Sequence, residues 1–311
     1  MRRAVLLDRA SLHPDDLDFS ALAALPLALT CHEHTPATAT AARLAGAEIA
    51  ITNKVVIDAA VMAACPDLRC IAVTATGTNN IDRAAAQARG ITVMNVEGYG
   101  TRAVAQHTLA LLLALTNRLA EYTRDVRNGR WSASPTFCLM DYPIRDLDGA
   151  VLGIVGYGAL GQEVARLAAA FGMQVLVAEG DAGPAPGRLP LAEVLARADV
   201  LSLHTLLTPR TEKMINAERL AQMKPGALLV NTARGGLVDE AALLAALQSG
   251  HLAGAALDVL AVEPPPADHP LLAAGLPNLI VTPHCAWISR GARQRLLDST
   301  VDNLRRHLAA S

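Results

Sequence analysis

The sequence predicts an α/β protein built from two doubly wound parallel sheets. Short β-branched or apolar runs alternate with Ala/Leu-rich stretches of helical periodicity along the 311 residues. This alternation is typical of parallel strands that helices cover on both faces. A glycine fingerprint, Gly156-Tyr157-Gly158-Ala159-Leu160-Gly161, stands at mid-chain and follows an apolar run. The residues before it are numerous enough to form a first α/β unit, so a second unit begins late in the chain.

Composition excludes several classes of function. Hydrophobic residues make up 52% of the chain and charged residues 18%, which is typical of a folded globular protein. A net charge of -2 gives no electrostatic reason to expect nucleic acid or an anionic membrane as a partner. The five cysteines form no CxxC pair and no export signal precedes them, so we expect reduced thiols and a cytoplasmic location. We expect no metal site, because His32 and His34 lack further ligands nearby.

The first half contains five expected strands. They are residues 5–7, 28–30, 49–52, 71–74 and 92–95. Asp82 is expected to cap a helix that Gly90 ends. From about residue 101 to residue 128 the sequence is continuously helical, with Gly129 as its stop. A helix of that length could connect two lobes.

The second half repeats the strand and helix alternation. Strands are expected at residues 150–155, 174–178, 200–204, 227–231, 253–258 and 279–282. The stretches 180–190 and 263–270 are rich in proline and glycine, so they are expected to be loops. Residues 291–311 are again helical, and we expect them to return to the first unit.

The glycine fingerprint has the context that a dinucleotide site requires. A buried strand precedes it and a helix follows it. The first glycine allows a tight turn, the second allows the pyrophosphate to approach, and the third allows the helix to pack on the strand. Glu179 comes eighteen residues after Gly161, at a strand end where a carboxylate would bind ribose hydroxyls and repel a 2′-phosphate. Gly180 and Asp181 follow it with no adjacent arginine, so the sequence predicts NAD over NADP.

Three later segments place chemically active side chains beside expected strand ends. They are residues 231–236 (NTARGG), residues 257–264 (from LDV to EP) and residues 282–287 (TPHCAW). The carboxyl ends of strands in a doubly wound sheet face one cleft, so these segments can converge there.

At these segments the chain resembles the D-isomer-specific 2-hydroxyacid dehydrogenases over nearly its full length. Residues 51–55 (ITNKV), 74–82 (TATGTNNID), 98–101 (GYGT) and 104–107 (VAQH) are similar to the glycerate dehydrogenase, or hydroxypyruvate reductase, branch. The resemblance implies a flavodoxin-like substrate domain, residues 1–98 and 286–311. It also implies an NAD-binding Rossmann domain, residues 99–285, with the active site between the two.

The resemblance implies a catalytic set of Arg234, Glu263 and His284. A forked, always charged Arg234 can hold the substrate carboxylate and polarise its C2 oxygen. His284 can donate a proton to that oxygen as hydride arrives. Glu263 would orient the imidazole and favour its protonated form.

The remaining implied contacts fall into two sets. Cofactor contacts are expected from Gly156, Tyr157, Gly158, Ala159, Leu160, Gly161, Glu179, His204, Thr205, Thr232, Ala233 and Asp258, the last at the nicotinamide carboxamide. Substrate contacts are expected from Asn53, Thr76, Gly77, Arg234 and Trp287. His107 is expected in the core or at an interface, and Cys285 as a small buried side chain.

Two classes of function remain open at this point. The first is an NAD-dependent enzyme that reduces hydroxypyruvate to D-glycerate and also takes glyoxylate, or else another 2-oxo acid reductase of the family. The second is an NAD(H)-sensing binding protein on the same fold. The resemblance also implies a homodimer formed through the cofactor domain and the long helix.

Overall fold

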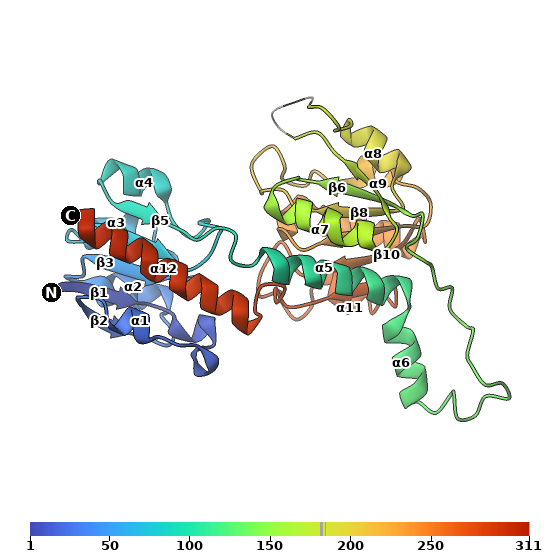
Figure 1. Ribbon diagram of the computed structural model, residues 1–311, viewed down its shortest axis with the longest axis horizontal. Helices are drawn as coiled ribbons and strands as arrows, with labels where there is room; N and C mark the ends of the chain where they lie inside the picture. The colour runs from blue at the N-terminus through green and yellow to red at the C-terminus, as the bar shows by residue number, and fades with distance from the viewer. Residues whose placement is uncertain (181–182, 184, 311) are drawn as a thin grey trace. The chain divides into compact units, whose positions relative to one another are not determined.

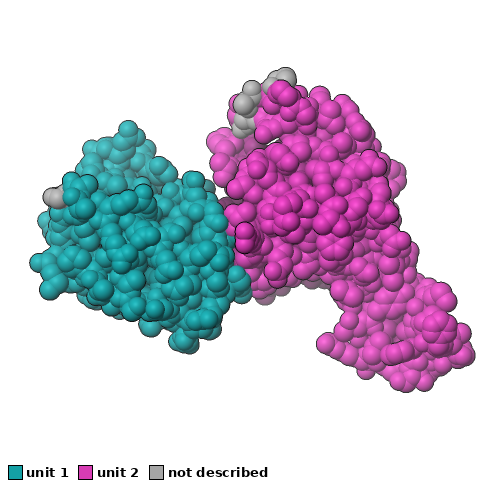
Figure 2. Space-filling model, in the orientation of Figure 1, with its two compact units in different colours: residues 1–100, 288–311 teal, residues 101–287 magenta. Residues whose placement is uncertain are grey.

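The computed structural model describes residues 1–180, 183 and 185–310. Asp181, named above as a neighbour of Glu179, lies outside them. The chain forms two compact units (Figures 1 and 2). Unit 1 consists of Met1–Gly100 and the C-terminal segment that begins at Ile288, and unit 2 is Thr101–Trp287. No described helix is long and apolar enough to cross a bilayer.

Unit 1 is built on a parallel sheet, five-stranded within the described residues, in the order β2-β1-β3-β4-β5. The strands are β1 (Arg2–Leu6), β2 (Leu27–Cys31), β3 (Ile49–Thr52), β4 (Cys70–Val73) and β5 (Thr92–Met94). This is the doubly wound order 2-1-3-4-5, in which ligands bind at the carboxyl ends of the strands. All five strands lie within a few residues of their expected positions.

Two apolar clusters cover the two faces of this sheet. The α-helices of unit 1 are α1 (Ser20–Ala23), α2 (Thr40–Leu44), α3 (Ala59–Ala64), α4 (Arg83–Ala88) and α12 (Arg290–Ala310). Asp82 caps α4 by accepting a hydrogen bond from Ala85 N–H, as predicted. On one face, Leu297, Val301 and Leu304 of α12 pack with strand residues of the first segment. The C-terminal helix therefore completes the core of unit 1, as expected.

Unit 2 is built on a parallel sheet with the order β11-β10-β9-β8-β6-β7, six-stranded within the described residues. The strands are β6 (Val151–Val155), β7 (Gln174–Val177), β8 (Val200–Leu203), β9 (Ala227–Asn231), β10 (Leu252–Leu257) and β11 (Leu279–Val281). Beyond β7, Ala178 forms a parallel bridge with Leu189. Leu189 thus stands where the third strand of the 3-2-1-4-5-6 Rossmann order would lie.

Helices also cover both faces of the unit 2 sheet. One face packs against α5 (Thr101–Thr116) and α7 (Ala159–Ala170), which lie side by side in Figure 1. The other face packs against α8 (Leu191–Arg197), α9 (Ala217–Gln222), α10 (Glu240–Gln248) and α11 (Pro270–Ala273). The two parallel sheets confirm the predicted α/β class.

The prediction of one continuous helix over residues 101–128 is wrong. The helix ends at Thr116, and α6 (Leu119–Arg127) starts in a new direction. Between them, the backbone of Arg118 has the left-handed conformation, with φ +52°. A right-handed helix cannot continue through such a residue. Asn117 caps the break by donating its side-chain amide to the Leu113 carbonyl, 3.0 Å away. No glycine or proline marks this point, so composition did not reveal it.

Candidate active site

Every cofactor or catalytic segment predicted in unit 2 follows a strand of one parallel sheet. Gly156 follows β6, Glu179 follows β7 and His204 follows β8, while Arg234, Asp258 and His284 follow β9, β10 and β11. Parallel strands end at one edge, so these segments gather at the carboxyl edge of the unit 2 sheet. This edge of unit 2 is the candidate active site.

The glycine turn between β6 and α7 is set by close backbone contacts. Gly156 has φ +93°, and a Cβ there would lie 2.5 Å from the carbonyl of His204 and 2.6 Å from Thr205 N. A Cβ on Gly161 would lie 2.1 Å from the carbonyl oxygen of Gly156. Both positions therefore require glycine, because the ends of β6 and β8 and the start of α7 meet there.

Gly158, the second glycine of the turn, has a different environment. It precedes α7 as its N-cap residue, and within the described part of the chain a Cβ there would meet no atom closer than 4 Å. No side chain of that part caps the helix, and both Gly158 and Ala159 are exposed. Free first-turn N–H groups and the positive end of the helix dipole favour a phosphate at this place. Tyr157 and Leu160 are half-buried, and Leu160 packs on the adjacent core.

The ends of β7 and β8 present two further polar side chains. Glu179 is half-buried, and its N–H donates to the Leu189 carbonyl at 2.8 Å. Its carboxylate makes no hydrogen bond or ion pair with the part of the chain that the structure describes, so it can accept ribose hydroxyls. Burial lowers the pKa of His204 to about 4. Its imidazole is therefore neutral at pH 7. Its Nε2 lies 2.8 Å from Ser202 Oγ, and its Nδ1 is buried without a hydrogen-bond partner among the described residues.

These features fit a dinucleotide. The α7 N-terminus can take the pyrophosphate and Glu179 the adenosine ribose, beside the backbone of His204 and Thr205. The glycine turn between β6 and α7 would hold the pyrophosphate, and the bound dinucleotide would supply the hydride chemistry.

The loop after β9 displays Arg234. Asn231 holds this loop, since its side chain accepts a hydrogen bond from Ala233 N–H (3.0 Å) and donates to the Arg234 carbonyl (2.9 Å). The guanidinium of Arg234 is half-buried and donates to the Ala233 carbonyl at 2.6 Å. Within residues 1–180, 183 and 185–310 no carboxylate pairs with it. Arg234 is therefore a cation whose remaining donors can bind a substrate carboxylate. Thr232 is buried, its hydroxyl 2.9 Å from that of Thr108.

His284 and Glu263 form a close pair. His284 Nδ1 lies 2.7 Å from Glu263 Oε2, and Glu263 Oε1 accepts the N–H of Leu260 at 3.0 Å. His284 has the left-handed backbone angle φ +52°, and its N–H donates to the carbonyl of Asp258 at 2.8 Å. Such a backbone persists only where its surroundings hold it, as is common at active sites. With Nδ1 held by a carboxylate, Nε2 is left to serve as the proton-transfer atom.

Asp258 is the polar centre beneath this pair. It is 1% exposed. Its Oδ1 accepts hydrogen bonds from Thr282 Oγ1 (2.5 Å) and Cys285 N–H (2.9 Å), and its Oδ2 accepts one from Ala286 N–H (2.9 Å). Burial opposes ionisation of this carboxyl, but hydrogen bonds from His107, Thr282 and the two backbone N–H groups outweigh it and lower its pKa. The segment that carries His284 is thus wrapped around a buried carboxylate.

Sequence reasoning assigned no site role to His107 or Thr282, which complete this network. His107 of α5 places Nε2 3.4 Å from Asp258 Oδ1 and 3.1 Å from Thr282 Oγ1. Cys285 Sγ lies 3.6 Å from Asp258 Oδ1, and burial and that carboxylate raise the pKa of its thiol. The one sequence signal for His107 is its place in the VAQH segment, and its partner lies about 150 residues away in sequence.

The predicted substrate residues divide between the two units. In unit 1, Asn53 follows β3 and is buried, with its N–H donating to Asp8 Oδ1 at 2.9 Å. Thr76 follows β4, is exposed and donates to the Val96 carbonyl at 2.8 Å, and Gly77 beside it is half-buried. These residues share the carboxyl edge of the unit 1 sheet. Trp287, half-buried, is the last residue of unit 2.

Fold and site together define a nicotinamide-dinucleotide-dependent oxidoreductase. Residues 109–286 match the family model for the D-isomer specific 2-hydroxyacid dehydrogenase, NAD binding domain. The chain belongs to this family, whose members interconvert 2-hydroxy acids and 2-oxo acids with NAD(P). The family resemblance and the predicted enzyme class are confirmed.

Individual relatives are similar over most of the chain. Glycerate dehydrogenase from Methylorubrum extorquens is 51% identical over 267 residues, which are 86% of this chain and 84% of that one. Hydroxypyruvate reductase from Blautia hydrogenotrophica is 39% identical over 99% of this chain and 98% of its own. The crystal structure of TT0316 protein from Thermus thermophilus superposes with a TM-score of 0.88 at 40% identity, covering 99% of this chain and 97% of that one.

An added methyl group should affect binding at one glycine near the start of α7 and stability at the other. Gly158→Ala should weaken dinucleotide binding at least about tenfold with an unchanged unfolding midpoint, because its Cβ would project into space left for the ligand. Gly161→Ala should instead destabilise the protein by about 1–3 kcal/mol, because its Cβ collides with the Gly156 carbonyl. Fluorescence titration with NADH and thermal unfolding of both variants test this. Equal loss of stability in both would contradict it.

Proposed function

We propose that this protein reduces hydroxypyruvate to D-glycerate with NADH, and glyoxylate to glycolate as a second reaction. The observation that carries the proposal is the His284–Glu263 pair at 2.7 Å beside the segment that carries Arg234, a cation without a carboxylate partner among the described residues. Glycerate dehydrogenase and hydroxypyruvate reductase are among the proteins to which the chain is most similar. We propose the same activities for this protein.

In the proposed reaction the chain's residues bind, orient and move one proton. Arg234 pairs with the α-carboxylate of the 2-oxo acid and polarises the C2 carbonyl. When bound, NADH would supply the hydride for the new C2–H bond and become NAD⁺. His284 Nε2 gives its proton to the C2 oxygen, so the carbonyl becomes a hydroxyl group and the imidazole becomes neutral. Glu263 keeps Nδ1–H hydrogen-bonded throughout and stabilises the protonated imidazole before transfer.

The preference for NADH over NADPH is part of the proposal. Glu179 follows β7, and its carboxylate is unpaired among the described residues, so a 2′-phosphate there would meet like charge. Asn53, Thr76 and Gly77 of unit 1 and Trp287 are proposed to contact the substrate, and Asp258 and Thr232 the nicotinamide end. Asp258 could still accept a carboxamide N–H through Oδ2, which takes fewer hydrogen bonds than Oδ1.

The activity and the role of Arg234 are tested together. Purified protein should oxidise NADH on addition of hydroxypyruvate, and NADPH at a lower kcat/KM. Arg234→Ala should lower kcat/KM for hydroxypyruvate by about 10³-fold or more, because it removes a charge-assisted carboxylate contact and the polarisation of C2. Its affinity for NADH should change less than about threefold. Arg197→Ala, which removes an exposed cation of α8, is the matched control.

Other outcomes of that assay would decide between the alternatives. Turnover of a branched 2-oxo acid or pyruvate, without hydroxypyruvate turnover, would reassign the substrate within the family. NADH binding by both parent and variant, with no turnover of any 2-oxo acid in a panel, would favour an NAD(H)-sensing role.

We further propose that unit 2 forms a homodimer through α6 and the segment that follows it, residues 128–146, together called the arm. The arm projects from the body of unit 2 (Figures 1 and 2). Six of the thirteen exposed large apolar residues in the described chain lie on it: Leu119, Val126, Trp131, Phe137, Met140 and Ile144. Exposed apolar and aromatic groups of this density are typical of an interface between protein chains.

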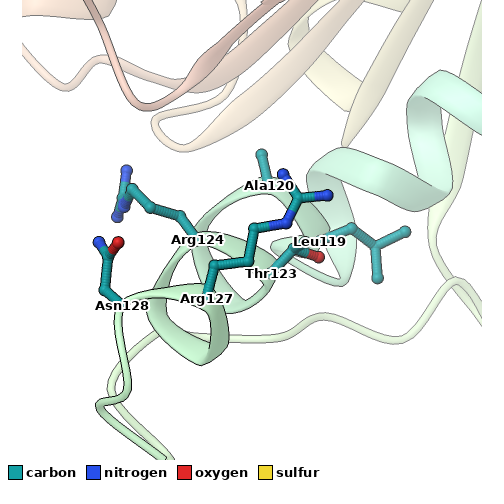
Figure 3. Close-up of a pocket in the computed structure, with 6 residues that line it drawn as sticks. All are labelled: Leu119, Ala120, Thr123, Arg124, Arg127 and Asn128. Carbon is teal, nitrogen blue, oxygen red and sulfur yellow. The ribbon is translucent and has the colours of Figure 1, made fainter.

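Polar contacts shape the arm but leave its apolar groups uncovered. Tyr122 and Tyr142 pack edge to face with ring centroids 5.1 Å apart, and Tyr142 OH donates to Asp125 Oδ2 at 2.9 Å. A hollow of about 490 Å³ along α6 is lined by Leu119, Ala120, Thr123, Arg124, Arg127 and Asn128 (Figure 3). A second copy of the chain, related by a two-fold axis, would offer the same apolar groups in return.

The dimer is tested by sedimentation of an arm variant. The wild type should sediment as a dimer, and the double change Phe137→Ser with Met140→Ser should shift it toward monomer, because both side chains are more than four-fifths exposed in the isolated chain. Val56→Ser removes an exposed apolar residue of unit 1 and should leave the dimer intact. A monomeric wild type, or an unaffected arm variant, would refute the interface.

A further inference from the structure

The loop that presents Glu263 has little structure of its own. Residues 258–269 connect β10 to α11 without a helix or strand, and residues 261–264 are exposed. An exposed loop with few buried contacts opens easily unless specific interactions hold it. Glu263 nevertheless lies 2.7 Å from His284 Nδ1. The contacts that hold this loop therefore decide whether that pair forms.

Glu240, the first residue of α10, holds the loop at both ends. Its Oε1 accepts the N–H of Ala261 at 2.8 Å, two residues before Glu263. Its Oε2 lies 3.2 Å from Nε2 of His269, the residue that precedes α11. The Glu240 side chain is 21% exposed and that of His269 is 7% exposed, so water screens this pair only weakly.

The segment between these two contacts is stiff. Pro264, Pro265 and Pro266 directly follow Glu263, and each proline fixes its own φ near −65°. Upstream, a Cβ on Gly235 would lie 1.9 Å from the carbonyl carbon of Leu260, so the Arg234 loop lies directly against the start of this segment. When both ends of a short, stiff loop are held, the Glu263 side chain between them has few alternative positions.

We propose that Glu240 and His269 are positioning residues for the proton transfer, acting through the Ala261 backbone to keep Glu263 against His284. The inference rests on the proposed function, in which His284 is the proton donor. Glu240 lies outside the motifs that indicated the site, and it reaches the reaction only through Glu263. Its removal should therefore impair the chemical step and leave cofactor binding intact.

Glu240→Ala tests the proposal, with Glu240→Gln as the conservative variant. The alanine variant should lower kcat for hydroxypyruvate about 10- to 100-fold, because misplacement of a catalytic group by about 1 Å can cost that much. Its KM for NADH should stay within about twofold. Glutamine keeps an oxygen acceptor for Ala261 N–H and should restore most of the activity. Glu218→Ala removes an exposed carboxylate from the first turn of α9 and should have no effect.

Rescue by the conservative variant separates positioning from general damage. Glu240→Gln keeps an acceptor for Ala261 N–H, so its kcat should stay near that of the wild type while Glu240→Ala loses activity. Glu263→Gln should lower kcat at least as much as Glu240→Ala, because it changes the group that Glu240 positions. A folded Glu240→Ala enzyme with the wild-type kcat, or a lowered kcat that Glu240→Gln does not restore, would overturn the proposal.

A spectroscopic measurement keeps this test independent of turnover. A His Nδ1–H bonded to a carboxylate gives a downfield proton resonance in NMR spectra. The resonance of His284 should be present in wild type, Glu240→Gln and Glu218→Ala, and lost or exchange-broadened in Glu240→Ala and Glu263→Gln. If the wild type reduces no 2-oxo acid, the proposed function fails, while this resonance still tests the positioning. Its persistence in Glu240→Ala would contradict the inference.

His269→Asn covers the case in which Glu240→Ala does not fold. It removes the imidazole at the end of the loop and leaves the Glu240–Ala261 hydrogen bond in place. We expect a smaller loss of kcat than in Glu240→Ala. An unchanged kcat would show that the Glu240–His269 contact does not position Glu263.

Discussion

The buried carboxylate of Asp258 is the interaction on which the rest of the site depends. It stands at the end of β10, and the backbone N–H groups of Cys285 and Ala286 converge on it from the segment after β11. A buried charge is stable only when it is hydrogen-bonded, and here most of the hydrogen bonds come from the segment that carries His284. The left-handed backbone of His284 is held by the same residue, whose carbonyl accepts its N–H at 2.8 Å. Asp258 therefore holds the backbone of the segment that carries His284, while Glu263 holds the imidazole itself.

Close backbone contacts join the other loops to this centre. At Gly161 the start of α7 packs on the Gly156 carbonyl, and at Gly235 the loop after β9 packs on the backbone that leads to Glu263. Both contacts exclude a side chain, so the loops keep a fixed spacing along the sheet edge. Glu240 adds a hydrogen bond on the far side of the same loop. The candidate catalytic side chains are thus held mainly by neighbouring backbone groups and by Glu240.

Much of this arrangement could be predicted from residue order. Alternating strands and helices indicated both sheets, and in a parallel sheet residues after neighbouring strands share an edge, which brought Arg234, Asp258 and His284 together. Contacts between distant segments could not be predicted. His107 meets Asp258 because α5 packs on the unit 2 sheet, and Glu240 meets His269 across an irregular loop. The break at Arg118 also escaped prediction, since it needs no glycine or proline and only one left-handed residue.

The central role of Asp258 is tested most directly by the stability of Asp258→Asn as a function of pH, followed by tryptophan fluorescence during urea unfolding. Both tryptophans, Trp131 and Trp287, lie in unit 2. An asparagine side chain has one oxygen acceptor, whereas both oxygens of Asp258 accept hydrogen bonds. The variant should therefore be less stable than wild type at pH 7 by about 2 kcal/mol. The native carboxyl has a lowered pKa, so its stabilisation is complete above the ordinary Asp value and is lost as the pH falls through the native one. The difference should therefore shrink steadily on acidification below about pH 4. A difference that is absent at pH 7, or that stays constant down to pH 3, would contradict the account.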